Sequence, residues 1–466
     1  MRNIIIFFWL TLPVHFLSAQ ESLNNQRIDG YRGIWFTLGQ FSEYGDKYSG
    51  GLGTYTAKHI PLAYYSPETD KTFFVYGGTT AADQKHLLCM ISYYDHQTGM
   101  VPKPVVVHDK MEVIDPHDDP SLWIDEKGYI WVFVSGRGTR RMGFKYRSVE
   151  PYKIDKFEQI TEEEMTYPQP KYIPGKGFLH LFTKYSGIRE LYFETSEDGY
   201  EWTEDQKIAG IVEDGATRAG HYQVSNQTGD KISTFFNRHP DGNVDQRTDL
   251  YYLETTDMGK SWQDIEGKKM DIPLTKVSSS ARVIDYAAQG KNVYLKDLNF
   301  DQQGNPVCLY VSSGGHQPGP DNQPYEWRVT FWNGETWQTA VITTSDHNYD
   351  MGSLYIEDKT WRVLGPTGIG PQKWQAGGEM ELWESKDRGK NWKKKREITI
   401  NSKFNHTYAR RPVNASQDFY AFWADGDPTE FSISRLYFVD KKGKKVFQLP
   451  YEMNQDLMKP TRKKFK

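Results

Sequence analysis

The sequence predicts an all-β protein folded as a seven-bladed β-propeller, and three observations support this fold class. A short strand, a tight polar turn and a second, more hydrophobic strand recur roughly every 50 to 70 residues, a period typical of propeller blades. Aromatic residues make up 15% of the chain, which favours β structure. Helix signals are sparse. Closing such repeats into a ring leaves no long exposed strand edge and places a funnel at the centre.

Each repeat is expected to supply the two innermost strands of one blade. The turns between them carry residues that favour tight reversals, as in Asp125-Glu-Lys-Gly and Asp301-Gln-Gln-Gly. The seven units run over Ala63–Tyr76, Ser121–Ser135, Pro168–Lys184, Tyr222–Arg238, Val293–Ser312, Ser353–Gly365 and Tyr408–Trp423.

A second repeat, Ser/Thr-x-Asp-x-Gly-x-x-Trp, runs in phase with the first. Thr255–Trp262 and Ser385–Trp392 match it fully, Thr195–Trp202 has Glu197 in place of Asp, and Thr330–Trp337 is degenerate. In such a hairpin the glycine allows positive φ, the aspartate bonds the turn backbone and the tryptophan packs beneath it. These hairpins resemble the Asp-boxes, or BNR repeats, of sialidase-like propellers, and the resemblance implies a structural role at the periphery of the blades.

Composition and the ends of the chain define the domain organisation. We expect a signal peptide over residues 1–19, a single propeller over 20–455 and a solvated basic tail over 456–466. No later stretch is long and apolar enough to span a bilayer, so a periplasmic or secreted protein is expected. Cys89 and Cys308 are predicted to be buried free thiols. The net charge of −4 argues against nucleic acid as a partner.

Candidate site residues gather where the funnel opens. The loop that enters each innermost strand and the end of the following strand should reach the same rim, and both sets are rich in His, Tyr, Arg and Lys. The entering loops contribute His59, His117, Tyr167, His221, Tyr222, His347, Tyr349, His406 and Tyr408, whereas the strand ends contribute Arg137, Lys184, Arg238, His239 and His316. Carboxylates are fewer, namely Asp118, Asp119, Asp346 and Asp350.

This residue set favours one kind of chemistry. No carboxylate pair stands out, although most glycosidases need one, and no nucleophile elbow, P-loop or dinucleotide fingerprint is present. Cations and phenols instead suit an anionic sugar. Arg or Lys can neutralise a uronate carboxylate, while Tyr or His removes the C5 proton and protonates the oxygen that leaves C4. Such β-elimination requires no cofactor. A structural metal ion held by His with Asp118 or Asp119 stays open, but no metal-ligand spacing supports it.

Several motifs resemble the BNR-4 family of secreted propellers over nearly the whole mature chain. They are Tyr31-Arg-Gly-Ile-Trp35, His117-Asp-Asp-Pro-Ser-Leu, Thr166-Tyr-Pro-Gln-Pro, Tyr222-Gln-Val-Ser with the following Ile232–Pro240, and Ser345–Leu354. Characterised members of that family are seven-bladed ulvan lyases. The resemblance implies a carbon–oxygen lyase acting on an anionic algal glycan of uronate and sulfated rhamnose, as a chain-cleaving lyase or as a dehydratase of a non-reducing-end uronate.

The resemblance also implies roles for individual residues. Tyr222 matches a base or acid, His117 a catalytic or binding histidine, and Arg238 or His239 the partner that neutralises charge. The residues expected to bind substrate are Arg137, Tyr167, Lys184, His221, His347 and Tyr349. Arg137 stands where a second histidine is expected, about twenty residues after His117. An arginine there cannot act as a base near neutral pH, which favours binding of a terminal uronate or a sulfate.

Two alternative functions belong to other classes. A glycoside hydrolase related to sialidases would use the same hairpin repeats, but it needs three arginines around a carboxylate and a Tyr/Glu nucleophile pair. A non-catalytic glycan-binding propeller would use the aromatic residues alone. Replacing Tyr222 by Phe separates an enzyme from a lectin, because only the enzyme loses a reaction.

Overall fold

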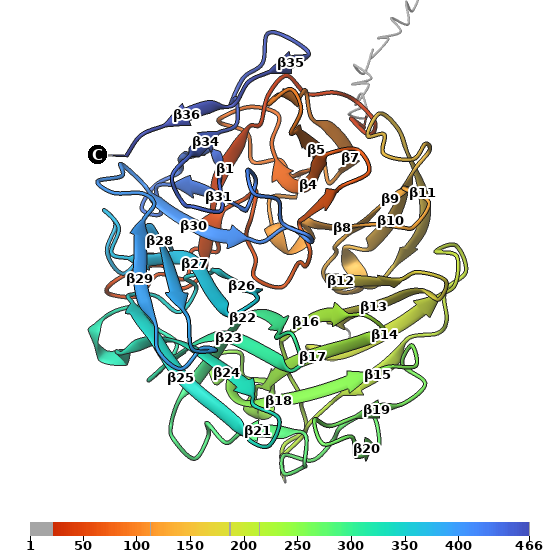
Figure 1. The fold of residues 1–466 in the computed structure, drawn as a ribbon, viewed down its shortest axis with the longest axis vertical. Coiled ribbons are helices and arrows are strands. Elements are labelled where there is room, and N and C mark those ends of the chain that lie inside the picture. Colours follow the sequence, from red (N-terminus) through yellow and green to blue (C-terminus); the bar gives the residue numbers. More distant parts are fainter. Residues whose placement is uncertain (1–21, 112, 186–187, 214, 466) are drawn as a thin grey trace, which may run out of the picture.

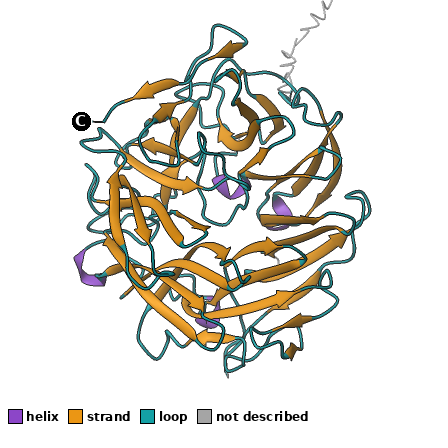
Figure 2. Cartoon of the chain, viewed as in Figure 1, coloured by secondary structure: helices purple, strands orange, loops and turns teal. Residues whose placement is uncertain are grey.

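The structure is a computed structural model that describes residues 22–465 except 112, 186–187 and 214. The expected signal peptide over residues 1–19 lies outside this range. Within it, seven antiparallel sheets are arranged in a ring around a central axis (Figure 1). Strands dominate, and the helical segments are single short turns (Figure 2). These turns are η1 (Pro116–Asp118), η2 (Gly138–Arg140), η3 (Pro240–Gly242) and η4 (Pro320–Asn322).

The first four blades follow one another around the ring, each from its innermost to its outermost strand. Blade 1 is β3 (Ala63–Ser66), β4 (Lys71–Gly78), β5 (Leu88–Asp95) and β7 (Val105–Asp109); blade 2 is β8 (Pro120–Ile124), β9 (Ile130–Val134), β10 (Gly143–Ser148) and β11 (Phe157–Glu163). Blade 3 is β12 (Thr166–Ile173), β13 (Gly177–Lys184), β14 (Glu190–Ser196) and β15 (Gln206–Ala209); blade 4 is β16 (Gln223–Thr228), β17 (Lys231–Arg238), β18 (Thr248–Thr255), β19 (Trp262–Gln263) and β20 (Lys269–Met270), with β21 (Arg282–Ile284) beside β18.

The remaining blades complete the ring. Blade 5 is β22 (Asn292–Phe300), β23 (Pro306–Ser313), β24 (Tyr325–Trp332) and β25 (Trp337–Ser345); blade 6 is β26 (Ser353–Glu357), β27 (Thr360–Gly368), β28 (Glu379–Ser385) and β29 (Lys393–Glu397). Blade 7 is β30 (Asn405–Arg410), β31 (Ala421–Gly426), β33 (Leu436–Val439), β34 (Val446–Gln448) and β36 (Thr461–Lys463). The seven units inferred from the repeat coincide with the two inner strands of these blades, which confirms the predicted fold class.

Second strands of the blades are largely buried on both faces because every blade packs between two others, whereas innermost strands such as β16 and β30 carry many polar residues. All five residues of β9, Ile-Trp-Val-Phe-Val, are buried, as are all eight of β23. Alternation of polar and apolar residues returns only in outer strands such as β25. Cys89 and Cys308 lie in these buried layers as free thiols, as predicted.

The hairpin repeat connects the third and fourth strands of blades 3 to 6. In blade 4, Asp257 accepts bonds from the backbone N–H and hydroxyl of Ser261, and Gly259 has φ +80°. Blade 3 achieves the same turn with a shifted residue. Asp198, and not Glu197, accepts from the backbone N–H groups of Tyr200 and Glu201.

Both ends of the described chain join blades. β1 (Gly33–Thr37) pairs with β2 (Ser49–Gly51) and with β32 (Ile433–Ser434) beside blade 7. β35 (Leu457–Met458) pairs with β6 (Val101–Pro102), and β36 forms the outer edge of blade 7. The basic segment expected to be a solvated tail is mostly exposed, although it contributes the short strands β35 and β36. Phe465 packs against His406 and Tyr437. Among the described residues, no helix is long and apolar enough to cross a membrane.

Candidate active site

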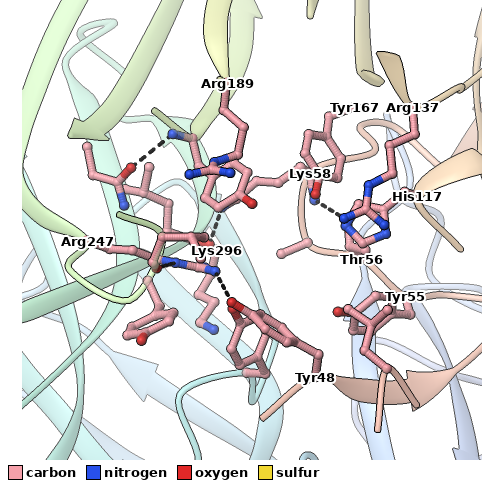
Figure 3. Close-up of a pocket in the computed structure, with 18 of the residues that line it drawn as sticks. Tyr48, Tyr55, Thr56, Lys58, His117, Arg137, Tyr167, Arg189, Arg247 and Lys296 are labelled. Atoms are coloured by element: carbon pink, nitrogen blue, oxygen red, sulfur yellow. Dashed lines mark hydrogen bonds between the residues drawn. The ribbon is translucent and has the colours of Figure 1, made fainter. Parts of the chain in front are cut away.

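A pocket of about 140 Å³ lies where the inner strands of the ring converge. Its wall is made of tyrosines and cations, and the described residues that line it include no aspartate or glutamate. The tyrosines are Tyr48, Tyr55, Tyr167, Tyr185, Tyr222, Tyr294 and Tyr349, and the basic residues are Lys58, His117, Arg137, Arg189, Arg247 and Lys296. Figure 3 shows Arg189 and Arg247 on one side of the pocket and His117 and Arg137 on the opposite side.

Tyr222 is the most unusual ionisable group of the pocket. It directly precedes β16, its backbone N–H donates to Asn237 Oδ1 at 3.0 Å, and its ring lies edge-on to that of His239 at 4.8 Å. Burial opposes ionisation of its phenol. The guanidinium groups of Arg247 and Arg189 and hydrogen bonds from Tyr185 and Tyr167 outweigh that effect, so the pKa of Tyr222 is lowered. No other tyrosine in the described part of the chain has a resolved downward shift.

Arg247 is buried among aromatic rings. Its guanidinium carbon lies 4.7 Å from the ring centroid of Tyr222, 4.9 Å from Tyr294 and 5.2 Å from Tyr349. It donates to the hydroxyl of Tyr48 at 3.2 Å and to a backbone carbonyl. Among the described residues, no carboxylate lies within ion-pair distance of Arg247, although only 5% of this residue is exposed. The positive charge is therefore held by π faces and neutral oxygens.

Arg189 stands beside Arg247 in a similar state. It comes immediately before β14, and its guanidinium donates to the backbone carbonyl of Gly242. Its Nε atom is buried without a hydrogen-bond partner, and no described carboxylate pairs with it. Two adjacent guanidinium groups without counter-charge form a site for an anion.

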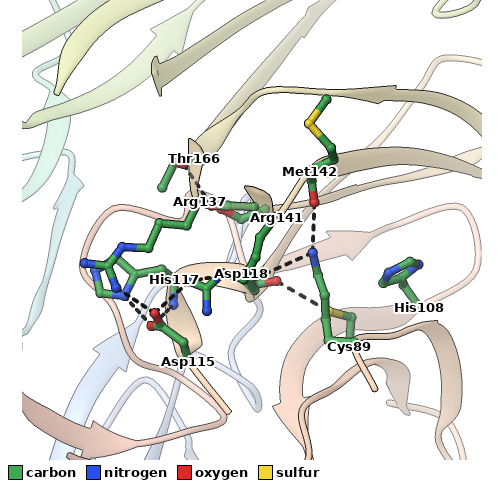
Figure 4. Close-up of polar contacts among 12 residues, drawn as sticks. Cys89, His108, Asp115, His117, Asp118, Arg137, Arg141, Met142 and Thr166 are labelled. Atoms are coloured by element: carbon green, nitrogen blue, oxygen red, sulfur yellow. Dashed lines mark hydrogen bonds and ion pairs between the residues drawn. The ribbon is translucent and has the colours of Figure 1, made fainter. Parts of the chain in front are cut away.

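The opposite wall is organised by one carboxylate, Asp115 (Figure 4). Asp115 caps η1, accepting from the backbone N–H of His117 at 3.1 Å, and its side chain also bonds His117 Nδ1. Its other oxygen accepts from Arg137 and from Arg141, both at 2.7 Å. With Nδ1 fixed by Asp115, the Nε2 atom of His117 is the one available for substrate.

Two lysines add positive charge to the floor of the pocket. Lys58 donates to the carbonyl of Leu295 and Lys296 to that of Asn348, both at 2.6 Å. Burial lowers the pKa of Lys296 to about 7 and that of Lys58 well below its usual range. Their ammonium groups therefore lose a proton more readily than an ordinary lysine does, whereas the guanidinium groups of the neighbouring arginines stay charged.

The structure places five of the predicted residues on the pocket wall: Tyr222, His117, Arg137, Tyr167 and Tyr349. The other five lie behind it and have partners in the fold or stack beneath the wall. Arg238 pairs with Asp249 and Glu213, Lys184 pairs with Asp205, His221 bonds the backbone of Asn237 and Ile211, His347 bonds the carbonyl of Asp46, and His239 supports the ring of Tyr222.

Sequence reasoning missed residues from two sources. Tyr48, Tyr55 and Lys58 come from the segment before the first blade, which the repeat does not cover. Arg189 and Arg247 stand at or before the starts of third strands, β14 and β18, whose connecting loops reach the same rim. An arginine at the entry to the third strand of two successive blades is the signal that would have found them. The stretch Gln263–Lys291 contributes β20 and β21 to the sheet of blade 4.

One group of carboxylates in the described chain has the spacing of a metal site. Glu163, Glu194 and Asp205 each place an oxygen within 4.8 Å of the others. Lys145 pairs with the two glutamates and Lys184 with Asp205, so lysines already supply the positive charge that a metal would bring. Of the two aspartates considered as ligands of a structural ion, Asp118 and Asp119, Asp118 lies within ion-pair distance of Lys110 and Arg141.

Fold and site together define a propeller with a central pocket for an anionic ligand. The model of the BNR repeat-containing family BNR_4 matches residues 62–345, and the chain belongs to this family. It is 22% identical over 326 residues to an ulvan lyase of Nonlabens ulvanivorans, covering 60% of this chain and 64% of that protein. It is also 22% identical over 284 residues to the ulvan lyase PL25 of Pseudoalteromonas sp. strain PLSV, covering 53% of this chain and 58% of that protein. The chain thus spans less than two thirds of the curated relatives it matches.

Solved structures show the same fold. The structure of a polysaccharide lyase PL25 ulvan lyase superposes with a TM-score of 0.71 at 17% identity, covering 90% of this chain and 96% of that one. The polysaccharide lyase Uly1 superposes with a TM-score of 0.59 at 10% identity, covering 90% and 98%. These likenesses extend over all seven blades and confirm the propeller.

Proposed function

We propose that this protein is a carbon–oxygen lyase that acts by β-elimination on uronate-containing glycans of the ulvan type. One observation carries the proposal: the pocket presents Arg189 and Arg247 without counter-charge beside Tyr222, whose pKa they lower. That combination is what removal of a proton next to a carboxylate requires. The names of the curated relatives support ulvan as the polymer, and a structure of the PL25 enzyme holds a disaccharide unit of glucuronate and sulfated rhamnose.

The reaction assigns a task to each wall. The uronate carboxylate binds Arg189 and Arg247, which neutralise it and acidify the proton on C5. Tyr222, as the phenolate, takes that proton. The C5–H electron pair becomes the C4–C5 double bond, and the C4–O bond breaks. His117 Nε2 protonates the departing oxygen. The charge-neutralising task expected of Arg238 or His239 passes to Arg247 and Arg189, since Arg238 is already paired and burial, with those arginines, lowers the pKa of His239 well below its usual range.

The leaving group decides between two reactions of the same chemistry. A sugar oxygen leaving C4 cleaves the chain, whereas a hydroxyl leaving C4 dehydrates a terminal uronate. We favour the chain end, because Leu38, Gln40, Tyr48 and Tyr55 of the N-terminal segment form one side of the pocket. Lys47 ties this segment to Asp245 in the loop before β18, which restricts passage of a polymer on that side.

Two further features belong to the proposal. The chemistry requires no cofactor, because protein side chains supply the base, the acid and the charge. The hydrophobic N-terminus of residues 1–19 supports export to the periplasm or medium, where an algal polysaccharide is met. No carboxylate lines the described pocket to act as a hydrolase nucleophile or acid, which disfavours the glycosidase alternative.

The test is to incubate the purified protein with ulvan and, separately, with ulvan oligosaccharides made by a lyase. Ultraviolet absorbance of an unsaturated uronate and mass analysis of products are the readouts. Oligosaccharides lighter by one water, with no chain cleavage, are the expected result. Absorbance from polymer with falling chain length would establish a chain-cleaving lyase instead. No new absorbance on either substrate would contradict the proposal and favour a binding propeller.

A further inference from the structure

A second, smaller cavity lies deeper along the central channel, away from the pocket described above. Innermost strands run from one space to the other. On β12, Tyr167 lines the pocket and Lys171 lines the deeper cavity. In the next blade, Tyr222, just before β16, lines the pocket and Asn226 of β16 lines the deeper cavity. Four residues of extended strand span about 13 Å. Lys296 lines both spaces. The deeper cavity has a volume of about 30 Å³, enough for a single small species.

The wall of this cavity carries an excess of buried positive charge. Arg411 is paired with Asp297, whose oxygens also accept the backbone N–H groups of Leu298 and Leu354. Lys171 and Arg410, 1% and 3% exposed, donate only to backbone carbonyls. In the described chain, no carboxylate lies within ion-pair distance of either. The cavity therefore holds Lys171 and Arg410 beyond its one internal ion pair, and Lys296 lines it as well. Burial lowers the pKa of both lysines to about 7, so a bound anion would keep their ammonium groups charged.

Nearby acids do not cancel this excess. Asp119 is the other carboxyl group that acts on Arg410, but burial and the adjacent Asp118 raise the pKa of Asp119 well above its usual range and favour its neutral form. Asp297 already serves Arg411. Burying a cation without a counter-charge is costly, and proteins meet that cost with a partner, a bound ion or loss of the proton.

We infer that the deeper cavity is a binding site for a small inorganic anion of about the size of chloride, held by Lys171, Arg410 and Arg411. The volume excludes a sugar and suits one ion. Asn226 contributes a neutral side chain to the same wall. The anion would supply the negative charge that no side chain provides at the centre of the ring, where the innermost strands of the seven blades converge. It would stabilise the ring without taking part in elimination. This inference does not depend on the proposed function.

The experiment is a bromide soak of crystals of the protein, read by anomalous diffraction, together with thermal unfolding in chloride and in gluconate at equal ionic strength. We expect an anomalous peak between Lys171 and Arg411, separate from any peak near Arg247. We also expect saturable stabilisation of about 1–3 °C by chloride over gluconate.

A matched pair of variants completes the test. Lys171→Met replaces the buried ammonium with an apolar chain of similar shape and should abolish the chloride-specific shift. Lys176→Met, at an exposed lysine paired with Asp230 in the same blade, should retain it. No peak in the deeper cavity, or equal stabilisation by chloride and gluconate in the native protein, would overturn the inference. Activity on uronate glycans plays no part in either readout.

Discussion

The two walls of the pocket hold positive charge in opposite ways. On one wall, His117, Arg137 and Arg141 share the carboxylate of Asp115. On the other, Arg189 and Arg247 are held by carbonyl and phenol oxygens and aromatic faces, with no described carboxylate in reach. The cations of the first wall already share a carboxylate partner, so their geometry is fixed before substrate arrives. The second carries the charge that only a ligand can match.

This difference separates positioning from activation. A shared carboxylate fixes the direction of a ring and a guanidinium group, as suits an acid that must meet one oxygen. Unmatched guanidinium groups create a field that lowers the pKa of the adjacent phenol and attracts a carboxylate. Substitutions on the second wall should therefore shift the rising limb of the pH profile that Tyr222 sets, whereas substitutions of Asp115 and Arg137 on the first wall should leave that limb in place.

The largest effect is expected for Tyr222→Phe. Loss of the hydroxyl removes the base, so kcat should fall by about 10³-fold or more. Binding of oligosaccharide should be nearly unchanged, because the ring stays in place. Steady-state kinetics and calorimetric titration measure the two quantities. A variant that retained more than a tenth of the native rate would remove Tyr222 from the reaction.

The second-largest effect on activity is expected for Arg247→Met, which removes a positive charge from the second wall. We expect kcat/KM to fall by about 10²- to 10³-fold. The guanidinium lowers the pKa of Tyr222, and the reaction needs the phenolate, so activity rises with pH through that pKa. Removing the charge raises this pKa and moves the rising limb to higher pH. Arg247→Lys keeps a positive charge, so its rising limb should lie between those of the native protein and the Met variant. If the rising limb of the Met variant stayed at its native pH, Arg247 would not control the pKa of Tyr222.

Asp115→Asn tests the wall whose cations share one carboxylate. His117 and Arg137 lose their common anchor, and kcat should fall by a factor of order 10 to 10² through misplacement. The rising limb set by Tyr222 should stay at its native pH, which distinguishes this variant from Arg247→Met. A shifted limb would show that the two walls are not separate.

Arg137→His sharpens the same comparison at a smaller scale. It restores the residue expected from the family resemblance while keeping a partner for Asp115. We expect kcat to change little and KM for anionic oligosaccharides to rise by about 3- to 10-fold, because a fixed charge is lost. Kinetics on substrates of increasing length measure this effect. Unchanged KM at every length would mean that Arg137 does not contact substrate.

The smallest effect is expected outside both walls, at the hairpin repeat. Asp257→Ala removes the acceptor for the backbone and hydroxyl of Ser261 and should cost about 1 kcal/mol of stability. Activity should be unchanged, since blade 4 keeps its inner strands. Denaturant unfolding and steady-state rates test both expectations. An equal loss of activity would place the repeat within the functional site.

The sequence predicts the blades well because their period is long and second strands such as β9 and β23 are hydrophobic and buried. It predicts the site less well because one residue of offset reverses a side chain in a strand. Asn237 lines the pocket and Arg238 does not; Tyr185 lines it and Lys184 does not; Tyr222 lines it and His221 does not. At these positions the side chain next to a predicted one lines the pocket, whereas the nearest lining residues to His239 and His347 are two positions away. The contributions of Tyr48 and Tyr55 arise from a contact between distant parts of the chain that no repeat reveals.

Pairing of Ile34 with Ile433 joins the N-terminal segment to the last blade. Tyr48, Tyr55 and Lys58 belong to that segment, and Arg410 of the last blade donates to the carbonyls of Thr56 and His59. During synthesis these early residues emerge first yet must wait for the final blade before they take their places. A nascent chain consequently has no complete pocket, and the pocket wall is completed only when the ring closes.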